Sequence, residues 1–286
     1  MNSPKEIAQG YIATGAAKAK LPAGKTLVLG IMAGMFIAVA AVGAIVSSST
    51  VASQSLARLI GAAVFPVGLA MTVVAGGELF TGNCLIIVPV LEKEVKLTAM
   101  LRNWCLAYIG NFAGSILIAA ITVYGGTFSL FGDAAAANLL NTAVSKVNLG
   151  FFDALLRGVL CNFLVCMAVW MSYAAKDIAG KIIGLYLPTM LFVLCSYEHS
   201  IANMLYIPAG LFAARKVEYL VAYTDQSRIS SLTWGAFVYK NLIPVTIGNI
   251  IGGAALVGLT YWLAYLRKAD DQPPAAHVNK NKKKKR

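Results

Sequence analysis

The sequence predicts an all-α polytopic membrane protein made of two inverted three-helix repeats, with one interrupted helix in each repeat. Three observations support this fold class. The chain of 286 residues is 58% hydrophobic and only 13% charged, which is too apolar for a soluble domain. Two apolar segments, 65–89 and 187–208, are each interrupted by a short polar stretch. Motifs of the first half also recur in the same order in the second half.

The later interrupted segment has the sequence LPTMLFVLCSYEHSIANMLYIP, residues 187–208. It begins as a membrane-grade apolar run and is then broken by polar residues that include Glu198 and His199. An ionisable side chain at membrane depth is costly, so it normally faces a cavity or a partner. A break also frees backbone groups that only protein or water can satisfy. We therefore expect this break to face the inside of the protein.

The earlier interrupted segment, 65–89, has the same design. Glu78-x4-Asn83 aligns with Glu198-x4-Asn203. We expect these four residues to stabilise the breaks, because buried carboxylates need hydrogen-bond partners. Interrupted apolar segments at matching positions of two halves predict a transport site near the membrane midplane.

The order of apolar and polar segments predicts six spans in a channel domain covering 25–267. The spans are 26–48, 59–90, 102–124, 151–174, 182–212 and 234–266. Residues 1–24 are expected to form an amphipathic helix on the cytoplasmic membrane surface. Residues 125–150 and 215–231 are expected to be polar loops, and 268–286 form a basic cytoplasmic tail.

The third and sixth spans support the repeat. The pattern Asn103-x6-Gly-Asn111 reappears as Asn241-x6-Gly-Asn249. Three spans per repeat is an odd number, so the second copy is inverted in the membrane. The repeats are expected to cover about 25–125 and 150–267.

Charge distribution predicts the orientation and the surroundings of the chain. Most of the 24 Lys and Arg residues lie on the termini and on the loops of the same side, which places both termini in the cytoplasm of a cell membrane. The final KNKKKKR is expected to contact anionic lipid or to be disordered. A nucleic-acid or targeting role is the alternative that we do not favour.

The residues that usually mark metal or cofactor sites are sparse. Five cysteines all lie in apolar segments without a CxxC pair, and the two histidines are far apart. The sequence also contains no cofactor fingerprint and no nucleophile–base pair. We therefore expect no metal, no cofactor, no nucleic-acid partner and no enzymatic activity.

Four motifs resemble the formate/nitrite transporter family: GGELFTGN (76–83), CNFLVCMAVWMSY (161–173), YEHSIANM (197–204) and NLIPVTIGNIIGG (241–253). The resemblance extends from about residue 11 to residue 267. It implies an aquaporin-like fold of six spans and a homopentamer with one pore in each protomer. It also implies conduction of small weak-acid anions: formate, nitrite, hydrosulfide, lactate or acetate.

The resemblance also implies roles for individual residues. It places a central histidine at His199, with a threonine of the first break at Thr81. Lining asparagines fall on Asn162 and Asn249, and a vestibule lysine falls on Lys146. The implied apolar constrictions are Phe65, Leu69, Leu79, Val165 and Phe192. The stretch KVNLGF (146–151) departs from the family's pattern, because it lacks a histidine-rich patch after the lysine.

Elementary physical chemistry fits these roles. An anion is costly to move through an apolar slit, whereas its neutral acid is far cheaper. A histidine between apolar constrictions therefore suits protonation in transit, since its ordinary pKa lies nearest neutral pH. Half-helices present positive dipole ends to an anion, and Lys146 adds a long-range attraction.

Each residue also has a purely structural alternative. His199 is then a buried histidine that stabilises the break, and Thr81 a cap for the half-helix that follows it. Asn162 and Asn249 then join helices, and Lys146 is a solvated loop charge. For Glu78 and Glu198, we favour hydrogen bonding to loop backbone over lining the pore. The structural alternative for the five constriction residues is that they pack inside the protein or face lipid.

We predict a channel or transporter for small monovalent weak-acid anions, with formate first and proton-linked passage past His199. Hydrosulfide, nitrite and short carboxylates such as lactate or acetate are the alternatives. A neutral-solute channel of aquaporin type is less favoured, because aquaporins have Asn-Pro-Ala in each break, whereas this chain has Thr-Gly-Asn and Ile-Ala-Asn.

Overall fold

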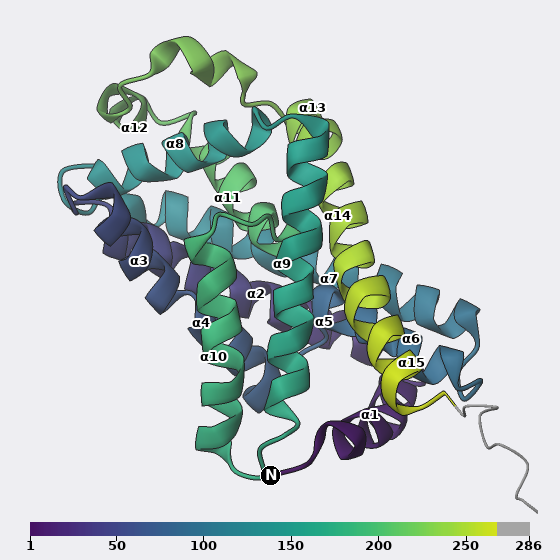
Figure 1. Cartoon of the computed structure of the whole chain (residues 1–286). Helices are drawn as coiled ribbons and strands as arrows, with labels where there is room; N and C mark the ends of the chain where they lie inside the picture. The colour runs from purple at the N-terminus through teal and green to yellow at the C-terminus, as the bar shows by residue number, and fades with distance from the viewer. Residues whose placement is uncertain (268–286) are drawn as a thin grey trace, which may run out of the picture.

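The computed structural model describes residues 1–267, so the basic tail 268–286 lies outside the described residues. The described chain is helical throughout, with short connections (Figure 1). Its α-helices are α1 (Pro4–Ala19), α2 (Ala23–Ser48), α3 (Gln54–Val64), α4 (Pro66–Met71), α5 (Phe80–Asn83), α6 (Ile87–Leu91), α7 (Leu97–Tyr124), α8 (Ala134–Val147), α9 (Phe151–Ser172), α10 (Ile178–Leu194), α11 (Ser200–Ala213), α12 (Val217–Ala222), α13 (Trp234–Ala236), α14 (Ile243–Ile250) and α15 (Thr260–Tyr265).

Tighter and wider helical turns link several of these helices. Three 3₁₀ turns cover Cys84–Ile86, Thr127–Ser129 and Gln226–Ser231. Three π-helical stretches cover Thr72–Gly76, Phe237–Leu242 and Ile251–Leu259. The last two π stretches lie within the helical run from α13 to α15, which is continuous over Trp234–Tyr265.

The helices match the spans that the sequence predicts. Within residues 1–267, five helical runs are long and apolar enough to cross a membrane: Ala23–Ser48, Gln54–Gly76, Leu97–Tyr124, Phe151–Ser172 and Trp234–Tyr265. The remaining predicted span consists of two shorter apolar helices, α10 and α11, separated by its break. The all-helical fold class with two interrupted helices is therefore confirmed.

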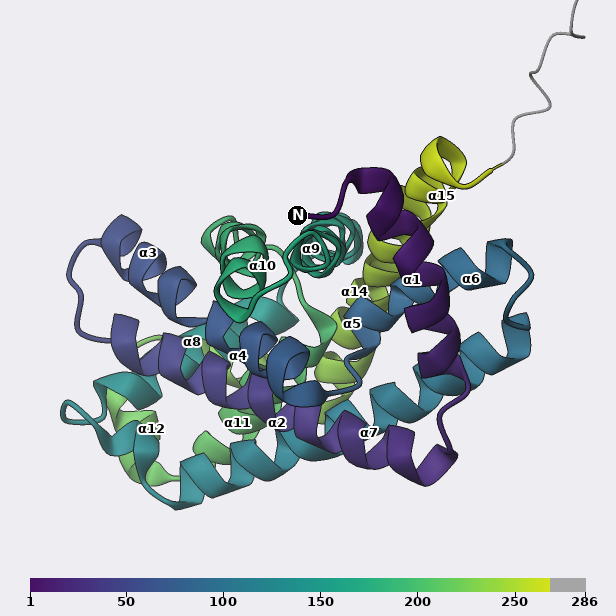
Figure 2. The same cartoon turned by 90° about the horizontal axis from the view of Figure 1, so that it is seen from below.

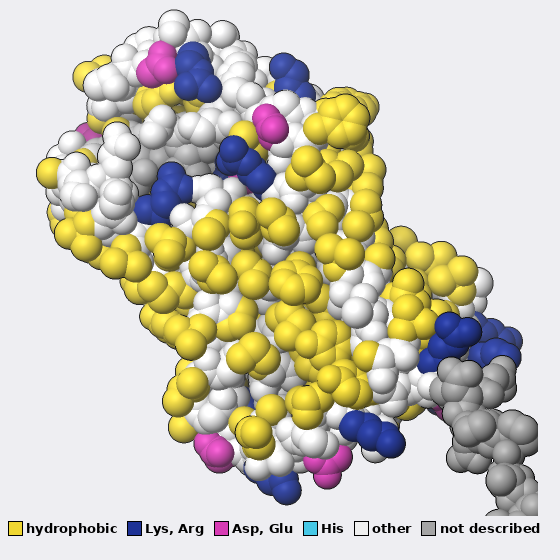
Figure 3. Space-filling view, in the orientation of Figure 1, with side chains coloured by type: hydrophobic (Ala, Val, Ile, Leu, Met, Phe, Trp, Pro, Cys, Tyr) yellow, Lys and Arg dark blue, Asp and Glu magenta, His cyan; other side chains and the backbone are white. Residues whose placement is uncertain are grey.

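The surface fits this arrangement. Figure 3 shows an apolar band across the middle of one face, with charged side chains near the upper and lower ends. Such a band matches the hydrocarbon core of a bilayer, and the charged ends match its two polar boundaries. Helices α1 and α15 pack together at the lower end (Figures 1 and 2).

Two long helix pairs form the frame, and both are packed through glycine. Helix α2 packs along α7, and α9 packs along α14 and the π stretch Ile251–Leu259 that continues it. A Cβ atom added at Gly110 would lie 2.7 Å from the carbonyl oxygen of Leu27, and one at Gly158 would lie 2.8 Å from that of Val245. Neither site has room for a side chain, so glycine permits the close approach of each pair.

Three segments differ from the prediction. Residues 125–150, expected to be a polar loop, contain helix α8, because a strip of apolar side chains packs one face of it into the protein. That strip is Leu139, Leu140, Ala143, Val144 and Val147. Residues 215–231, also expected to be a loop, contain α12 and the 3₁₀ turn Gln226–Ser231. The second span begins at Gln54 rather than 59, since Ser53 caps α3 by accepting from the Leu56 amide.

Candidate functional site

The two breaks interrupt their helices in the same way. Residues 77–79 separate the π stretch that follows α4 from α5, and residues 195–199 separate α10 from α11. A residue with positive φ lies at the start of each break, Gly76 with φ of 95° and Ser196 with φ of 55°. Glycine adopts this conformation without steric cost, whereas serine does so less readily. The two breaks therefore turn the chain at equivalent points.

A buried carboxylate holds the first break. Glu78 accepts hydrogen bonds from Lys18 Nζ at 2.7 Å, from Asn83 Nδ2 at 2.7 Å and from Asn103 Nδ2 at 3.3 Å. Its backbone amide donates to the carbonyl oxygen of Leu29 at 3.1 Å. The donors to the carboxylate are thus side chains and not the loop backbone that the sequence led us to expect, and they offset the cost of burying its charge.

The second break repeats this arrangement group by group. Glu198 accepts from Lys146 Nζ at 2.8 Å, from Asn203 Nδ2 at 2.7 Å and from Asn241 Nδ2 at 3.3 Å. Its amide donates to the carbonyl oxygen of Arg157 at 3.3 Å. Lys146 lies on helix α8 and forms an ion pair with Glu198, and its side chain is 15% exposed. The alternative of a solvated loop lysine is wrong.

A second pair of asparagines joins each break to the helix frame. Asn111 accepts from the amide of Phe80 and donates to the carbonyl oxygens of Gly30 and Glu78, at 2.8–3.0 Å. The Phe80 amide and the Glu78 carbonyl belong to the break and have no partner within a helix, whereas the Gly30 carbonyl lies within α2. The Asn111 side chain thus satisfies two groups of the break and joins the break to α2.

Asn249 does the same in the second half. It accepts from the amide of Ser200 and donates to the carbonyl oxygens of Gly158 and Glu198, at 2.8–3.0 Å. Asn162 Nδ2 donates to the carbonyl oxygens of Thr81 and Asn249, at 3.1 and 2.6 Å. Through these contacts Asn162 and Asn249 join helices, and both side chains are fully buried.

One contact connects the two breaks directly. Thr81 Oγ1 lies 3.0 Å from His199 Nε2. His199 is also the N-cap of α11, where its Nδ1 accepts from the amide of Ala202 at 3.0 Å. Because Nδ1 is an acceptor there, the proton of the neutral ring lies on Nε2 and is donated to Thr81. The hydroxyl hydrogen of Thr81 then remains available to a further acceptor.

Aromatic side chains lie on one side of this pair. Phe192 stacks on His199 with ring centroids 5.7 Å apart and an interplanar angle of 17°. Phe65 meets Phe192 edge to face, with centroids 5.6 Å apart. Both phenylalanines are buried, so together they form an apolar layer outside the histidine.

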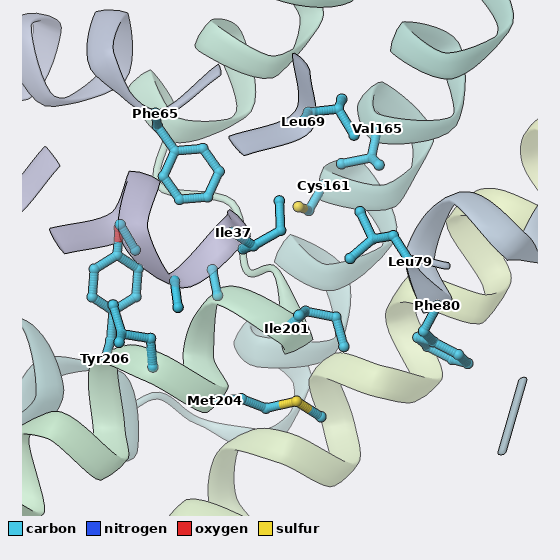
Figure 4. Close-up of a cluster of buried hydrophobic side chains, with 14 of the residues drawn as sticks. Ile37, Phe65, Leu69, Leu79, Phe80, Cys161, Val165, Ile201, Met204 and Tyr206 are labelled. Carbon is cyan, nitrogen blue, oxygen red and sulfur yellow. The ribbon is translucent and has the colours of Figure 1, made fainter. Parts of the chain in front are cut away.

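Three aliphatic residues predicted to form a constriction also lie together. Leu69, Leu79 and Val165 are each at most 3% exposed. Figure 4 shows Leu69 and Val165 pointing toward each other beside Cys161, with Leu79 next to them. These side chains come from α4, the first break and α9, so the fold brings together residues that are distant in sequence.

A cavity of about 540 Å³ opens beyond the phenylalanine layer, at the end of the molecule opposite α1. Phe65, Phe192 and His199 form part of its lining, together with residues of α3 and α8. Figure 3 shows a hollow in this region with basic side chains at its edge. A polar cavity thus reaches both the apolar layer and the histidine beside it.

Several residues of this site were not singled out from the sequence. Asn103, Asn111 and Asn241 belong to the motif that revealed the repeat, yet no role was assigned to them. Lys18 stands as far before Lys146 as Gly30 stands before Gly158, so the repeat contained a signal for it as well. The correspondence of the halves therefore includes α1 and α8, which lie outside the predicted repeats 25–125 and 150–267.

Comparisons with known proteins agree with this geometry. The formate/nitrite transporter family model matches residues 5–263. A "Probable formate transporter" of Methanothermobacter thermautotrophicus is 36% identical over 285 residues, covering 93% of this chain and 98% of that protein. "Formate channel FocA" of Escherichia coli K12 is 39% identical over 252 residues, covering 86% and 88%.

Solved structures show the same fold. A "Pentameric formate channel with formate bound" superposes with a TM-score of 0.78 at 33% identity, covering 86% of this chain and 98% of that chain. An "FNT family ion channel" gives a TM-score of 0.80 at 26% identity, covering 90% and 98%.

The helices, the paired breaks and the cavity define a multi-pass membrane protein with an internal polar site. With the match over nearly its whole length, the chain belongs to the formate/nitrite transporter family.

Proposed function

We propose that the protein is a pentameric formate channel in the cell membrane, with one pathway in each protomer and both termini in the cytoplasm. One observation supports it most directly. The pair Thr81–His199 lies where the two half-helices begin, with the layer of Phe65 and Phe192 on one side. Relatives named as formate transporters or channels, and a pentameric neighbour with formate bound, support the ligand and the assembly.

The pathway runs from the cavity, past the phenylalanine layer, to Thr81 and His199, and then past Leu69, Leu79 and Val165. A formate anion crossing the apolar layers loses its hydration, which makes passage as the neutral acid cheaper. Half-helix N-termini and the free hydroxyl hydrogen of Thr81 stabilise the anion between the layers. Between the two apolar layers, the pathway thus offers polar contacts only at this centre.

Proton transfer at this centre has a defined cost. His199 Nδ1 is engaged with the Ala202 amide, so a second ring proton binds only when that hydrogen bond breaks. The amide would then face a ring N–H instead of an acceptor. We propose that proton uptake by His199 accompanies loosening of this cap, and that the formate anion receives the proton there.

Replacing His199 with Asn tests this role. Asparagine is a good N-cap and keeps a hydrogen-bond donor, but it does not titrate. We expect His199→Asn to retain the fold and to lose the dependence of formate uptake on external pH between about pH 5 and 8. Flux and current in proteoliposomes check both points. A wild-type pH profile in the variant would show that His199 is structural and that the proton comes from bulk water.

The ligand is tested in the same proteoliposomes. A panel of formate, nitrite, hydrosulfide, lactate and acetate measures which anion crosses fastest. We expect formate to lead. A faster flux of hydrosulfide or nitrite would reassign the channel within its family, and native mass measurements that found only monomers in mild detergent would contradict the pentamer.

A further inference from the structure

The cavity outside the phenylalanine layer has an unusual charge balance. Its lining includes Lys146, Arg58 and Arg157 as cations and Glu198 as the single carboxylate. The carboxylate is paired with Lys146 at 2.8 Å. Among residues 1–267, neither arginine has an acidic side chain within salt-bridge distance. The cavity therefore has a net positive charge carried by two arginines rather than by the lysine that the sequence indicated.

Each arginine lies on a helix face that continues down the pathway. On α3 and α4, Arg58 is followed on the same face by Phe65 and Leu69, because steps of seven and four residues return to one side of a helix. On α9, Arg157 is followed in the same way by Cys161 and Val165, in steps of four. Both faces thus lead from a guanidinium group to an apolar constriction.

The scaffold itself does not require these side chains. The backbone of Arg157 accepts the amide of Glu198, and in the other half Leu29 makes the same backbone contact with Glu78. Arg58 aligns with Ile178 when the two breaks are superposed in sequence. Neither position is therefore basic in the matching half, so the two arginines distinguish this end of the pathway from the other.

We infer that Arg58 and Arg157 form an anion-capture site in the cavity that selects planar anions with two oxygen atoms, such as formate and nitrite, over hydrosulfide. A guanidinium group offers two parallel N–H donors that match two oxygen atoms. Hydrosulfide has a single heavy atom and is attracted only by the charge. This inference builds on the proposed function, because the captured anion is the one that then enters the pathway.

The charge is tested first, with Arg58→Gln and Arg157→Gln combined. Charged clefts raise local anion concentration, so we expect the formate concentration for half-maximal flux to rise ~10-fold at low salt, with the maximal flux unchanged. The difference should shrink as ionic strength rises, because exposed charges are screened over ~10 Å at 0.1 M salt. Arg215→Gln is the matched control, since Arg215 is exposed and lies outside the cavity lining. Equal half-maximal concentrations in the double variant and in the wild type would overturn the capture site.

The paired donors are tested with Arg58→Lys and Arg157→Lys combined, which keep both charges and lose the planar group. We expect the half-maximal concentration to rise ~3-fold for formate, on the scale of one exposed charged contact, and to stay unchanged for hydrosulfide. An equal rise for both anions would overturn the selection of two-oxygen anions.

A binding measurement separates this inference from the proposed function. Broadening of the formate NMR signal by the solubilised protein reports capture without requiring conduction. If the wild type broadens the signal but carries no formate, the proposed function fails while the capture site stands. If the wild type carries formate and the double Gln variant broadens the signal equally, only the capture site fails.

Discussion

The two halves of the molecule have the same scaffold and different chemistry. Glu78 and Glu198 each bind one lysine and two asparagines with nearly equal distances. At the residue before each half-helix, however, the first half has Leu79 and the second has His199. Two residues later, the first half has Thr81 and the second has Ile201.

This difference separates what the breaks need from what the pathway needs. The matching groups satisfy backbone and carboxylate atoms that both copies bury, so each copy requires them equally. The titratable and hydroxyl side chains are single, and they meet because inversion brings the two breaks together. A symmetric frame thus holds an asymmetric site, and four changes test that comparison.

The largest effect is expected from Asn111→Leu and from Asn249→Leu. Each change leaves two buried backbone groups of a break without a partner, at about 1–3 kcal/mol for each group, and also removes the hydrogen bond to α2 or α9. We expect both variants to lose about 3 kcal/mol or more of folding stability, and by similar amounts. Thermal unfolding in detergent measures this, with Asn141→Leu as the control, because Asn141 is exposed. A large loss in only one half would contradict the equivalence of the two breaks.

A smaller effect is expected from Glu78→Gln and Glu198→Gln. Each leaves a lysine without its anion. Breaking a fully buried pair costs about 3–5 kcal/mol, and partial exposure of the lysine reduces this to about 2 kcal/mol. The loss should be smaller for Glu78, because the side chain of Lys18 is 23% exposed and that of Lys146 is 15% exposed.

Glu218→Gln is the control for these two variants, because the Lys216–Glu218 pair lies on an exposed segment. We expect no measurable change in its unfolding temperature. Equal stability of all three variants would show that the buried carboxylates do not hold the breaks.

Thr81→Ala tests the asymmetric site without disturbing the frame. The change removes the hydroxyl group that accepts from His199, and we expect formate flux to fall ~10-fold, the scale of one hydrogen bond to a charged group. The pH profile should stay the same, because threonine does not titrate in this range. Thr81→Ser should restore most of the flux, and failure to do so would indicate a packing role for the threonine methyl group.

The smallest effect concerns the amphipathic helices at the start of each half. Helix α1 begins with a capping box, in which Ser3 accepts from the Glu6 amide and Glu6 accepts from Ser3. Helix α8 begins at Ala134, and its N-cap residue Asp133 makes no side-chain capping hydrogen bond. Hydrogen bonds from Ser3 hold the pKa of Glu6 below its ordinary value.

A lowered pKa in the folded state means that the contribution of Glu6 is present above the ordinary glutamate pKa, about 4.3, and is lost as the pH falls through the folded value. We therefore expect Ser3→Ala to increase hydrogen exchange in the first turn of α1 near neutral pH and to have less effect in acid. The first turn of α8 should be unaffected. An equal effect at both pH values would show that Glu6 does not contribute through its charge.

The sequence determined the apolar spans, the two breaks and their repeat, because insertion into a bilayer leaves a strong compositional pattern. It also singled out Glu78, Asn83, Glu198 and Asn203, since polar residues stand out in an apolar run. It did not reveal α8 as a helix, because an amphipathic segment of small residues resembles a polar loop when the surface that covers it is unknown.

Only the tertiary structure decided which groups meet. The contact of Thr81 with His199 spans 118 residues of chain, and the pairing of Lys146 with Glu198 spans 52. That pairing leaves the cavity's positive charge to Arg58 and Arg157. A one-dimensional pattern records which residues are polar, but hydrogen bonds and ion pairs depend on distance and direction in space. The fold sets those by inverting one half of the chain against the other.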